Sequence, residues 1–136
     1  MTLRMLLVDD EPHILRLMRL KFEAEGFEID TAPNGEAALK KILASPPDVL
    51  ITDIQMPRMT GEQLCHEIAA RLPEQPFLIV LLTSRTEVEH RIWSADFNNL
   101  WFFEKPVSMR KLIASLNGYQ QAQPADRSGD GYDSAL

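Results

Sequence analysis

The stretch MLLVDDE, residues 5–11, joins four consecutive apolar residues to three acids. An apolar run without polar alternation predicts a strand that is buried on both faces. Strands of this kind occur in parallel sheets that carry helices on both sides. The stretch therefore favours an α/β fold, and it places acidic side chains directly at the end of the first strand.

The same order of short apolar run and helical pattern repeats along the chain. The run at 77–82 is the longest and is expected to be a central strand, whereas 27–31 alternates and is expected at a sheet edge. We predict five strands at 5–8, 27–31, 49–53, 77–82 and 100–103, followed by helices within 12–25, 34–44, 61–72, 88–95 and 109–116. Asn34 is expected to cap the second of these helices. This alternation predicts a parallel, doubly wound sheet with helices on both faces.

Length and composition limit the classes of protein to which the chain can belong. Its 136 residues allow one domain. The 14 Lys and Arg residues against 20 Asp and Glu give a net charge of −6, and an acidic domain is unsuited to binding a nucleic-acid backbone. The single cysteine, Cys65, excludes an intramolecular disulfide framework and a cysteine-rich metal site. No apolar stretch approaches the roughly 18 residues of a membrane span, and the first residues do not resemble a signal peptide.

The chain changes character after about residue 119. Residues 120–136 are mostly small and polar and have few apolar side chains to bury. We therefore predict a folded domain at 1–119 and a disordered tail or linker at 120–136.

Polar side chains stand where the predicted strands end. Asp9 and Asp10 follow the first strand, Asp53 ends the third, and Thr83 and Lys105 follow the fourth and fifth. The carboxyl ends of parallel strands meet at one edge of the sheet, where such folds bind ligands. Because clustered carboxylates repel one another, we expect a cation, and Mg²⁺ prefers oxygen ligands. A metal, an ammonium and a hydroxyl suit a phosphoryl group, with Asp53 as the candidate nucleophile for an aspartyl phosphate.

Four short motifs give the chain a resemblance to a known family. They are VDDE at 8–11, DIQMPRMTG at 53–61, LTS at 82–84 and KP at 105–106. Through them, residues 3–119 resemble a response-regulator receiver domain of bacterial two-component signal transduction, similar to the chemotaxis regulators. The resemblance implies a flavodoxin-like (βα)5 fold whose five-stranded parallel sheet has the order 2-1-3-4-5.

The resemblance also implies a metal site. Asp53 would be the phosphoacceptor, and Asp10 and Asp53 would bind Mg²⁺ through their side chains. Gln55 would bind the metal through its backbone carbonyl, and Asp9 would act through a metal-bound water.

The resemblance assigns the remaining site residues as well. Thr83 would bond the phosphoryl group, Lys105 would pair with a phosphoryl oxygen, and Phe102 would be the aromatic switch residue. In the family the peptide bond between this lysine and the following proline is cis. Asn98 stands where the family often has a glycine before the last strand, and asparagine tolerates a left-handed conformation well.

A receiver of this kind is a signalling switch, and it is not an enzyme with an external product. The resemblance implies that a sensor histidine kinase or phosphotransfer protein phosphorylates Asp53. The face formed by the fourth helix, fifth strand and fifth helix would then control a downstream effector, an output domain of the same protein or a homodimer. The implied location is the bacterial cytoplasm.

Two other functions stay open from the residues alone. A scaffold of the same fold would bind partners without phosphorylation, although the complete set of acids, threonine and lysine argues against it. A phosphatase of the haloacid-dehalogenase type needs a second acid two residues after its nucleophile, where this chain has Gln55.

Two residues are predicted to tune the switch. Gln55 and Arg85 lie two residues beyond Asp53 and Thr83, and side chains at these positions flank the phosphoryl group in the family. We expect them to set the lifetime of the phosphorylated state, because a guanidinium pairs well with phosphoryl oxygens.

Three aromatic residues are predicted to form a partner surface. Trp93 and Trp101, with the neighbouring Phe102, would present apolar rings on the fourth-helix, fifth-strand and fifth-helix face. The alternative is that both indole rings cover the edge of the core.

Overall fold

The computed structural model describes residues 2–75, 77–84, 97 and 99–122 of the chain. The helix predicted at 88–95, together with Arg85, Trp93 and Asn98, lies outside the described residues. None of the helices in the described part is long and apolar enough to cross a membrane.

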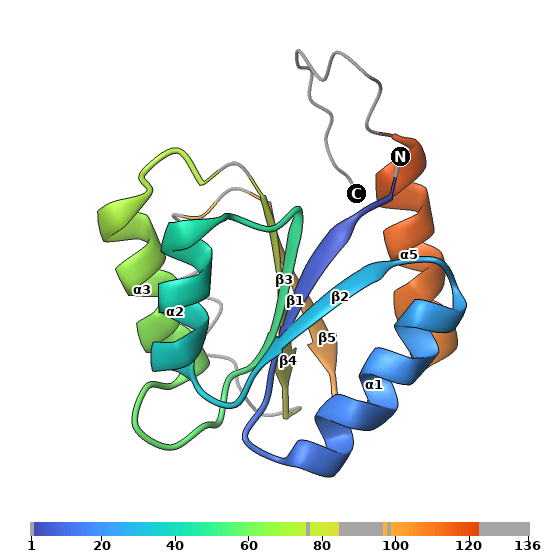
Figure 1. Ribbon diagram of the computed structural model, residues 1–136, viewed down its shortest axis with the longest axis horizontal. Coiled ribbons are helices and arrows are strands. Elements are labelled where there is room, and N and C mark those ends of the chain that lie inside the picture. Colours follow the sequence, from blue (N-terminus) through green and yellow to red (C-terminus); the bar gives the residue numbers. More distant parts are fainter. Residues whose placement is uncertain (1, 76, 85–96, 98, 123–136) are drawn as a thin grey trace.

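Five parallel strands form one sheet in the order β2-β1-β3-β4-β5 (Figure 1). This confirms the fold class and the strand order that the sequence analysis expected. The alternating strand is an edge strand, as predicted, and β4 is buried along its whole length. The strands are β1 at Arg4–Val8, β2 at Glu28–Ala32, β3 at Val49–Asp53, β4 at Leu78–Thr83 and β5 at Leu100–Glu104.

Helices cover both faces of the sheet. Figure 1 shows α2 and α3 on one face and α1 and α5 on the other. This arrangement follows from right-handed crossovers between parallel strands, which carry the chain from one face to the other as the strand order reverses. The described helices are α1 at Pro12–Ala24, α2 at Gly35–Ala44, α3 at Gly61–Arg71 and α5 at Met109–Gln121.

The alternation of side chains along each strand divides the core into two layers. Leu6, Leu50 and Ile79 face α2 and α3, whereas Met5 and Leu7 face α1 and α5. All five of these side chains are buried, because both faces of the inner strands are covered. The sheet is therefore held rigidly, and its carboxyl edge is a stable platform for the residues that follow each strand.

Side-chain caps determine where the helices begin. Asn34 accepts a hydrogen bond from the Ala37 amide (2.8 Å), which confirms the predicted cap of α2. Thr60 and Gln63 form a reciprocal capping box at α3, and that helix begins at Gly61. Each such cap contributes about 1 kcal/mol to helix stability.

The structure corrects the expected boundary of the domain. Helix α5 continues through Gln121, so Gln120 and Gln121 belong to the fold and not to the predicted tail. Glutamine is a good helix former, and Tyr119 packs edge-on against Trp101 with ring centroids 5.8 Å apart, which stabilises the last turns. Residues 123–136 lie outside the described residues. Among the described residues just before β5, Asn99 has a positive φ (43°).

One glycine is required by a close approach between backbones. Gly61 lies against the end of β3, and its amide donates to the Ile54 carbonyl oxygen over 2.9 Å. A Cβ atom at Gly61 would stand 2.6 Å from the Asp53 carbonyl oxygen and 2.8 Å from the Ile54 Cα. Any side chain at this position must displace the backbone at the end of β3.

We predict that Gly61→Ala lowers the free energy of unfolding by about 1–3 kcal/mol, the usual cost of overpacking. Gly118→Ala is the matched control. A Cβ at Gly118 meets no atom within 4 Å, and alanine should stabilise the α5 interior by about 0.5–1 kcal/mol. Urea denaturation of both variants measures the two changes, and equal effects would contradict the close approach.

Candidate functional site

Three carboxylates meet at the carboxyl edge of the sheet. Val8 of β1 is paired with Thr52 of β3, so Asp9 and Asp53 follow at adjacent positions. Asp9 and Asp53 are buried, and Asp10 beside them is exposed. One carboxylate oxygen from each residue lies within 4.8 Å of the other two. The sheet register therefore brings together acids that are more than 40 residues apart in the sequence.

In the described part of the chain, one ammonium group reaches this cluster, and it comes from the end of β5. Lys105 follows β5, and its Nζ lies 2.7 Å from Asp53 Oδ2. The Lys105 amide donates to the Thr83 carbonyl oxygen (2.7 Å), which holds the lysine at the end of β4. The Lys105-Pro106 peptide bond is cis, as the resemblance implied.

Backbone amides orient the two buried carboxylates. The Glu11 amide donates to Asp9 Oδ1 over 2.9 Å, and the Gln55 amide donates to Asp53 Oδ1 over 3.2 Å. Asp53 thus has an amide on one oxygen and an ammonium on the other. These amide contacts carry no side-chain signal, so the sequence motifs did not reveal them.

The electrostatics of the cluster favour a bound cation. Burial raises the pKa of Asp9 above its usual value, and the nearby charges of Asp53 and Asp10 raise it further. The hydrogen bond from the Glu11 amide and the charge of Lys105 lower this pKa, but they do not cancel the rise. Three carboxylates against one ammonium leave an excess of negative charge in a partly buried site. An oxygen-only donor set fits Mg²⁺, so the residues present suit the metal that the sequence analysis expected.

A family model described as the response regulator receiver domain matches residues 5–117. The chain belongs to the response-regulator receiver family. Its sheet order and its strand-end acids are those expected of a flavodoxin-like receiver.

Curated relatives and solved structures agree with this membership. Response regulator MprA of Mycolicibacterium vanbaalenii is 28% identical over 131 residues, which cover 96% of this chain and 56% of that protein. PhoP of Bacillus subtilis, an alkaline phosphatase synthesis transcriptional regulatory protein, is 31% identical over 116 residues, which cover 85% of this chain and 48% of that protein. The receiver spans about half the length of these relatives.

One solved structure adds a ligand-bound comparison. Response regulator protein TrrA of Thermotoga maritima, in complex with Mg(2+)-BeF, superposes with a TM-score of 0.72 at 36% identity. The match covers 87% of this chain and 98% of that one.

Two further predicted site residues share one face of the sheet in the receiver. Phe102 pairs with Leu81 in the β4–β5 register, and both pack in the layer under α2 and α3. Thr83 lies two residues beyond Leu81 and therefore points to the same face. Its hydroxyl donates to the Ser84 carbonyl oxygen over 3.0 Å. The residues predicted as switch partners are thus neighbours on adjacent strands.

Trp101 lies on the opposite face from Phe102. Its ring is half-buried and packs against Tyr119 of α5 and near Phe103, in the layer under α1 and α5. A partner surface that uses both Trp101 and Phe102 must therefore run around the exposed edge of β5. Trp93 and Arg85 lie outside the described residues, so their roles stay predictions.

We predict that Asp9→Asn raises the melting temperature of the metal-free receiver by about 3–6 °C, which corresponds to roughly 1 kcal/mol. The change removes a charge that burial and two neighbouring carboxylates disfavour, and the asparagine oxygen still accepts from the Glu11 amide. Saturating Mg²⁺ should shrink the gain, because the metal already screens the charge.

Asp30→Asn is the control for this measurement. Asp30 is exposed and pairs with Lys41 over 2.9 Å, so its neutralisation should give no gain in either buffer. Calorimetry with and without Mg²⁺ tests the prediction, and a lower melting temperature for metal-free Asp9→Asn would contradict it.

Proposed function

We propose that this receiver is a phosphorylation-activated switch that accepts a phosphoryl group on Asp53 with Mg²⁺ bound. The observation that carries the proposal is the contact between Lys105 Nζ and Asp53 Oδ2 inside the acidic cluster. A buried carboxylate with a lysine on one oxygen and two acids beside it has the groups that aspartyl phosphorylation requires. The TrrA complex with Mg(2+)-BeF supports the same chemistry in a relative.

The phosphoryl donor is a phosphohistidine on a sensor kinase or phosphotransfer protein. An Asp53 carboxylate oxygen attacks the phosphorus atom, an O–P bond forms, and the N–P bond to the donor imidazole breaks with its electron pair returning to the nitrogen. Asp10, Asp53 and the Gln55 carbonyl would hold Mg²⁺ directly, Asp9 would act through a metal-bound water, and the metal would supply positive charge for the phosphoryl oxygens. Lys105 moves from Asp53 to a phosphoryl oxygen.

Thr83 and Phe102 convert the new charge into a change of shape. The Thr83 hydroxyl turns from the Ser84 carbonyl toward a phosphoryl oxygen, and Phe102, on the same face of the sheet, shifts into the space that Thr83 leaves. A phosphoryl group thereby favours one of two arrangements that already exist in the unphosphorylated protein. Gln55 and Arg85 set how long the phosphoryl group survives hydrolysis.

The output of the switch is an interaction and not a released product. The chain catalyses only its own phosphorylation and dephosphorylation. It acts in the cytoplasm of a bacterium, and its one cysteine is free and buried. The downstream element is a partner protein, a second copy of the chain, or an output domain of the kind that the longer relatives have room to carry.

We predict that Asp53→Asn abolishes labelling by ³²P-acetyl phosphate with Mg²⁺, because the amide is not a competent nucleophile. The wild-type label should be released by hydroxylamine, as an acyl phosphate is, and Asp30→Asn should label like the wild type. Labelling of Asp53→Asn at the wild-type level would show that another residue is the phosphoacceptor, whereas an unlabelled wild type would support the phosphorylation-independent scaffold.

We also predict that Trp101→Asp weakens self-association of the receiver loaded with beryllofluoride while ³²P labelling of Asp53 persists. A charge at this half-buried position opposes apolar contact across the β5 edge. Analytical ultracentrifugation measures the association, and high salt should not weaken it in the wild type. An unfolded variant, or one that associates as the parent does, would show that Trp101 only covers the core.

A further inference from the structure

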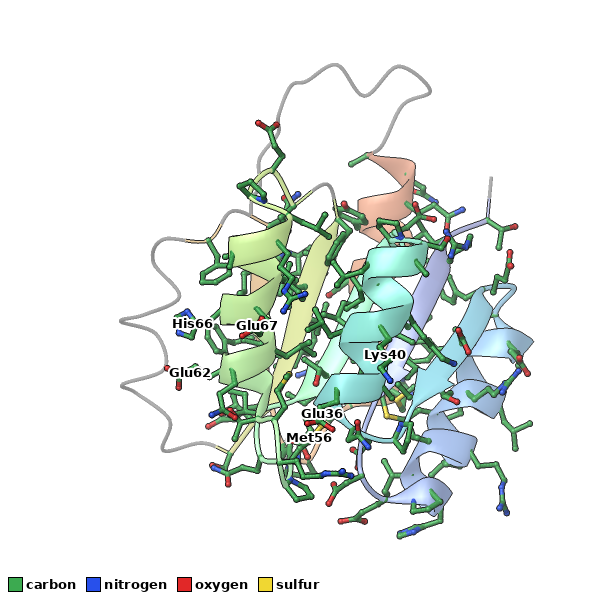
Figure 2. The ribbon with its side chains drawn as sticks, turned by 60° about the vertical axis from the view of Figure 1, so that its left-hand side comes forward. Glu36, Lys40, Met56, Glu62, His66 and Glu67 are labelled. Atoms are coloured by element: carbon green, nitrogen blue, oxygen red, sulfur yellow. The ribbon has the colours of Figure 1, made fainter. Side chains whose placement is uncertain are left out.

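A groove that the proposed phosphorylation chemistry does not use lies along the outer side of α2, between the loop before α3 and the last residue of α3. The cavity has a volume of about 540 Å³ and runs from the N-terminal turn of α2 to the last residue of α3. Figure 2 shows the two helices side by side on this face, with Glu36 and Lys40 on α2 and Glu67 on α3. We name this cavity the α2–α3 groove.

The floor of the groove is apolar. Leu39, Leu43 and Met59 line it, and Leu43 is 40% exposed although the other large apolar residues of its helix face the core. An isolated exposed leucine is ordinary on a protein surface. A leucine that lines a hollow beside other apolar side chains is instead a place where a partner's apolar side chain gains burial.

The rim of the groove is basic, although the chain as a whole carries a net charge of −6. Lys40, Arg58 and Arg71 line the cavity, and Glu36 is the one acid among its lining residues. Among the described residues Lys40 has no ion-pair partner, so its charge is free to meet a ligand.

Both arginines are held only loosely in their present contacts. Arg58 lies 3.7 Å from Glu36, with side chains 65% and 56% exposed, and Arg71 lies 3.2 Å from Glu67, with side chains 53% and 42% exposed. Exposed pairs of this kind contribute about 0–1 kcal/mol. An incoming carboxylate therefore replaces or joins them at little cost.

We propose that the α2–α3 groove docks an acidic segment of another protein that also presents an apolar side chain. The apolar side chain covers Leu39, Leu43 and Met59, and flanking carboxylates meet the three cations. A nucleic-acid strand fits less well, because three cations around an apolar floor offer few phosphate contacts and the chain as a whole carries a net charge of −6.

The groove also touches the loop that leaves the phosphoacceptor. Arg58 and Met59 belong to the loop between β3 and α3, which begins just after Asp53. Arg58 has a left-handed backbone (φ 70°), and Met59 packs so close to the start of α2 that a Cβ at Gly35 would lie 2.8 Å from the Met59 Cβ. A segment bound in the groove thus contacts residues of the loop that follows Asp53, yet docking itself needs no phosphoryl group.

The test begins with selection of random 16-residue peptides on phage against the immobilised full chain in low salt. Recovered peptides are then synthesised with a fluorescent label, and their affinities are measured by anisotropy. We expect peptides that combine Asp and Glu with Leu, Ile or Phe, and whose affinity falls as salt rises.

Matched variants locate the binding site. Leu43→Glu and Arg71→Glu should each weaken the recovered peptides by about tenfold or more, since each replaces a favourable contact by a repulsive one. Leu20→Glu and Arg19→Glu are the controls on α1. Leu20 is 58% exposed, and Arg19 makes an i,i+4 pair with Glu23 over 3.0 Å, as Arg71 does with Glu67.

A charge-swapped peptide, with Lys in place of its acids, should bind the Arg58→Glu/Arg71→Glu double variant better than it binds the wild type. That result would confirm charge complementarity even if one single variant folded poorly. The proposal is overturned if the recovered peptides are basic, if they bind the groove variants and the α1 controls equally, or if no groove-dependent peptide is recovered. Groove-dependent binding of a 20-nucleotide DNA strand, or groove-dependent self-association in ultracentrifugation, would reassign the site to nucleic acid or to a second copy.

Discussion

The site depends on one constraint: the sheet fixes two buried carboxylates and one exposed acid close together at its carboxyl edge. Asp9 and Asp53 are placed by the pairing of β1 with β3, so they cannot move apart to relieve their repulsion. Lys105 reduces that repulsion from the far side of β4, and its contact with Asp53 therefore joins both halves of the chain. The remaining negative charge favours a cation at this site, as the proposed Mg²⁺-dependent phosphorylation of Asp53 requires.

The backbone around Asp53 is packed as tightly as the side chains beneath it. Gly61 lies against the Asp53 carbonyl, and Met59 of the same loop lies against Gly35 of α2. The loop after Asp53 is thus enclosed between the sheet edge and a helix. The packed loop cannot absorb a small displacement at Asp53, because packed interiors shift between discrete arrangements and do not deform continuously.

The two faces of the sheet have different relations to the site. Thr83 and Phe102 share the face under α2 and α3, which is also the side of the α2–α3 groove. Trp101 belongs to the other face, where α5 covers it. The two proposed partner surfaces are therefore separate and chemically distinct: one is apolar and runs around the β5 edge, and the other lies between α2 and α3 and carries basic side chains.

Local sequence determined much of this protein. Continuous apolar runs predicted the inner strands, and alternation predicted that β2 is an edge strand. Asn34 predicted the start of a helix, and acids at the strand ends indicated the cluster. Each of these signals depends only on residues that are near one another in the sequence. Tertiary structure alone decided the rest. Register and packing between separate parts of the chain set the distance between Lys105 and Asp53 and supply the amides that orient Asp9 and Asp53. They also extend α5 to Gln121, where Tyr119 packs on Trp101, and they turn Trp101 and Phe102 to opposite faces of the sheet. Such contacts leave no local pattern, since each exists only after the sheet has brought its two partners together.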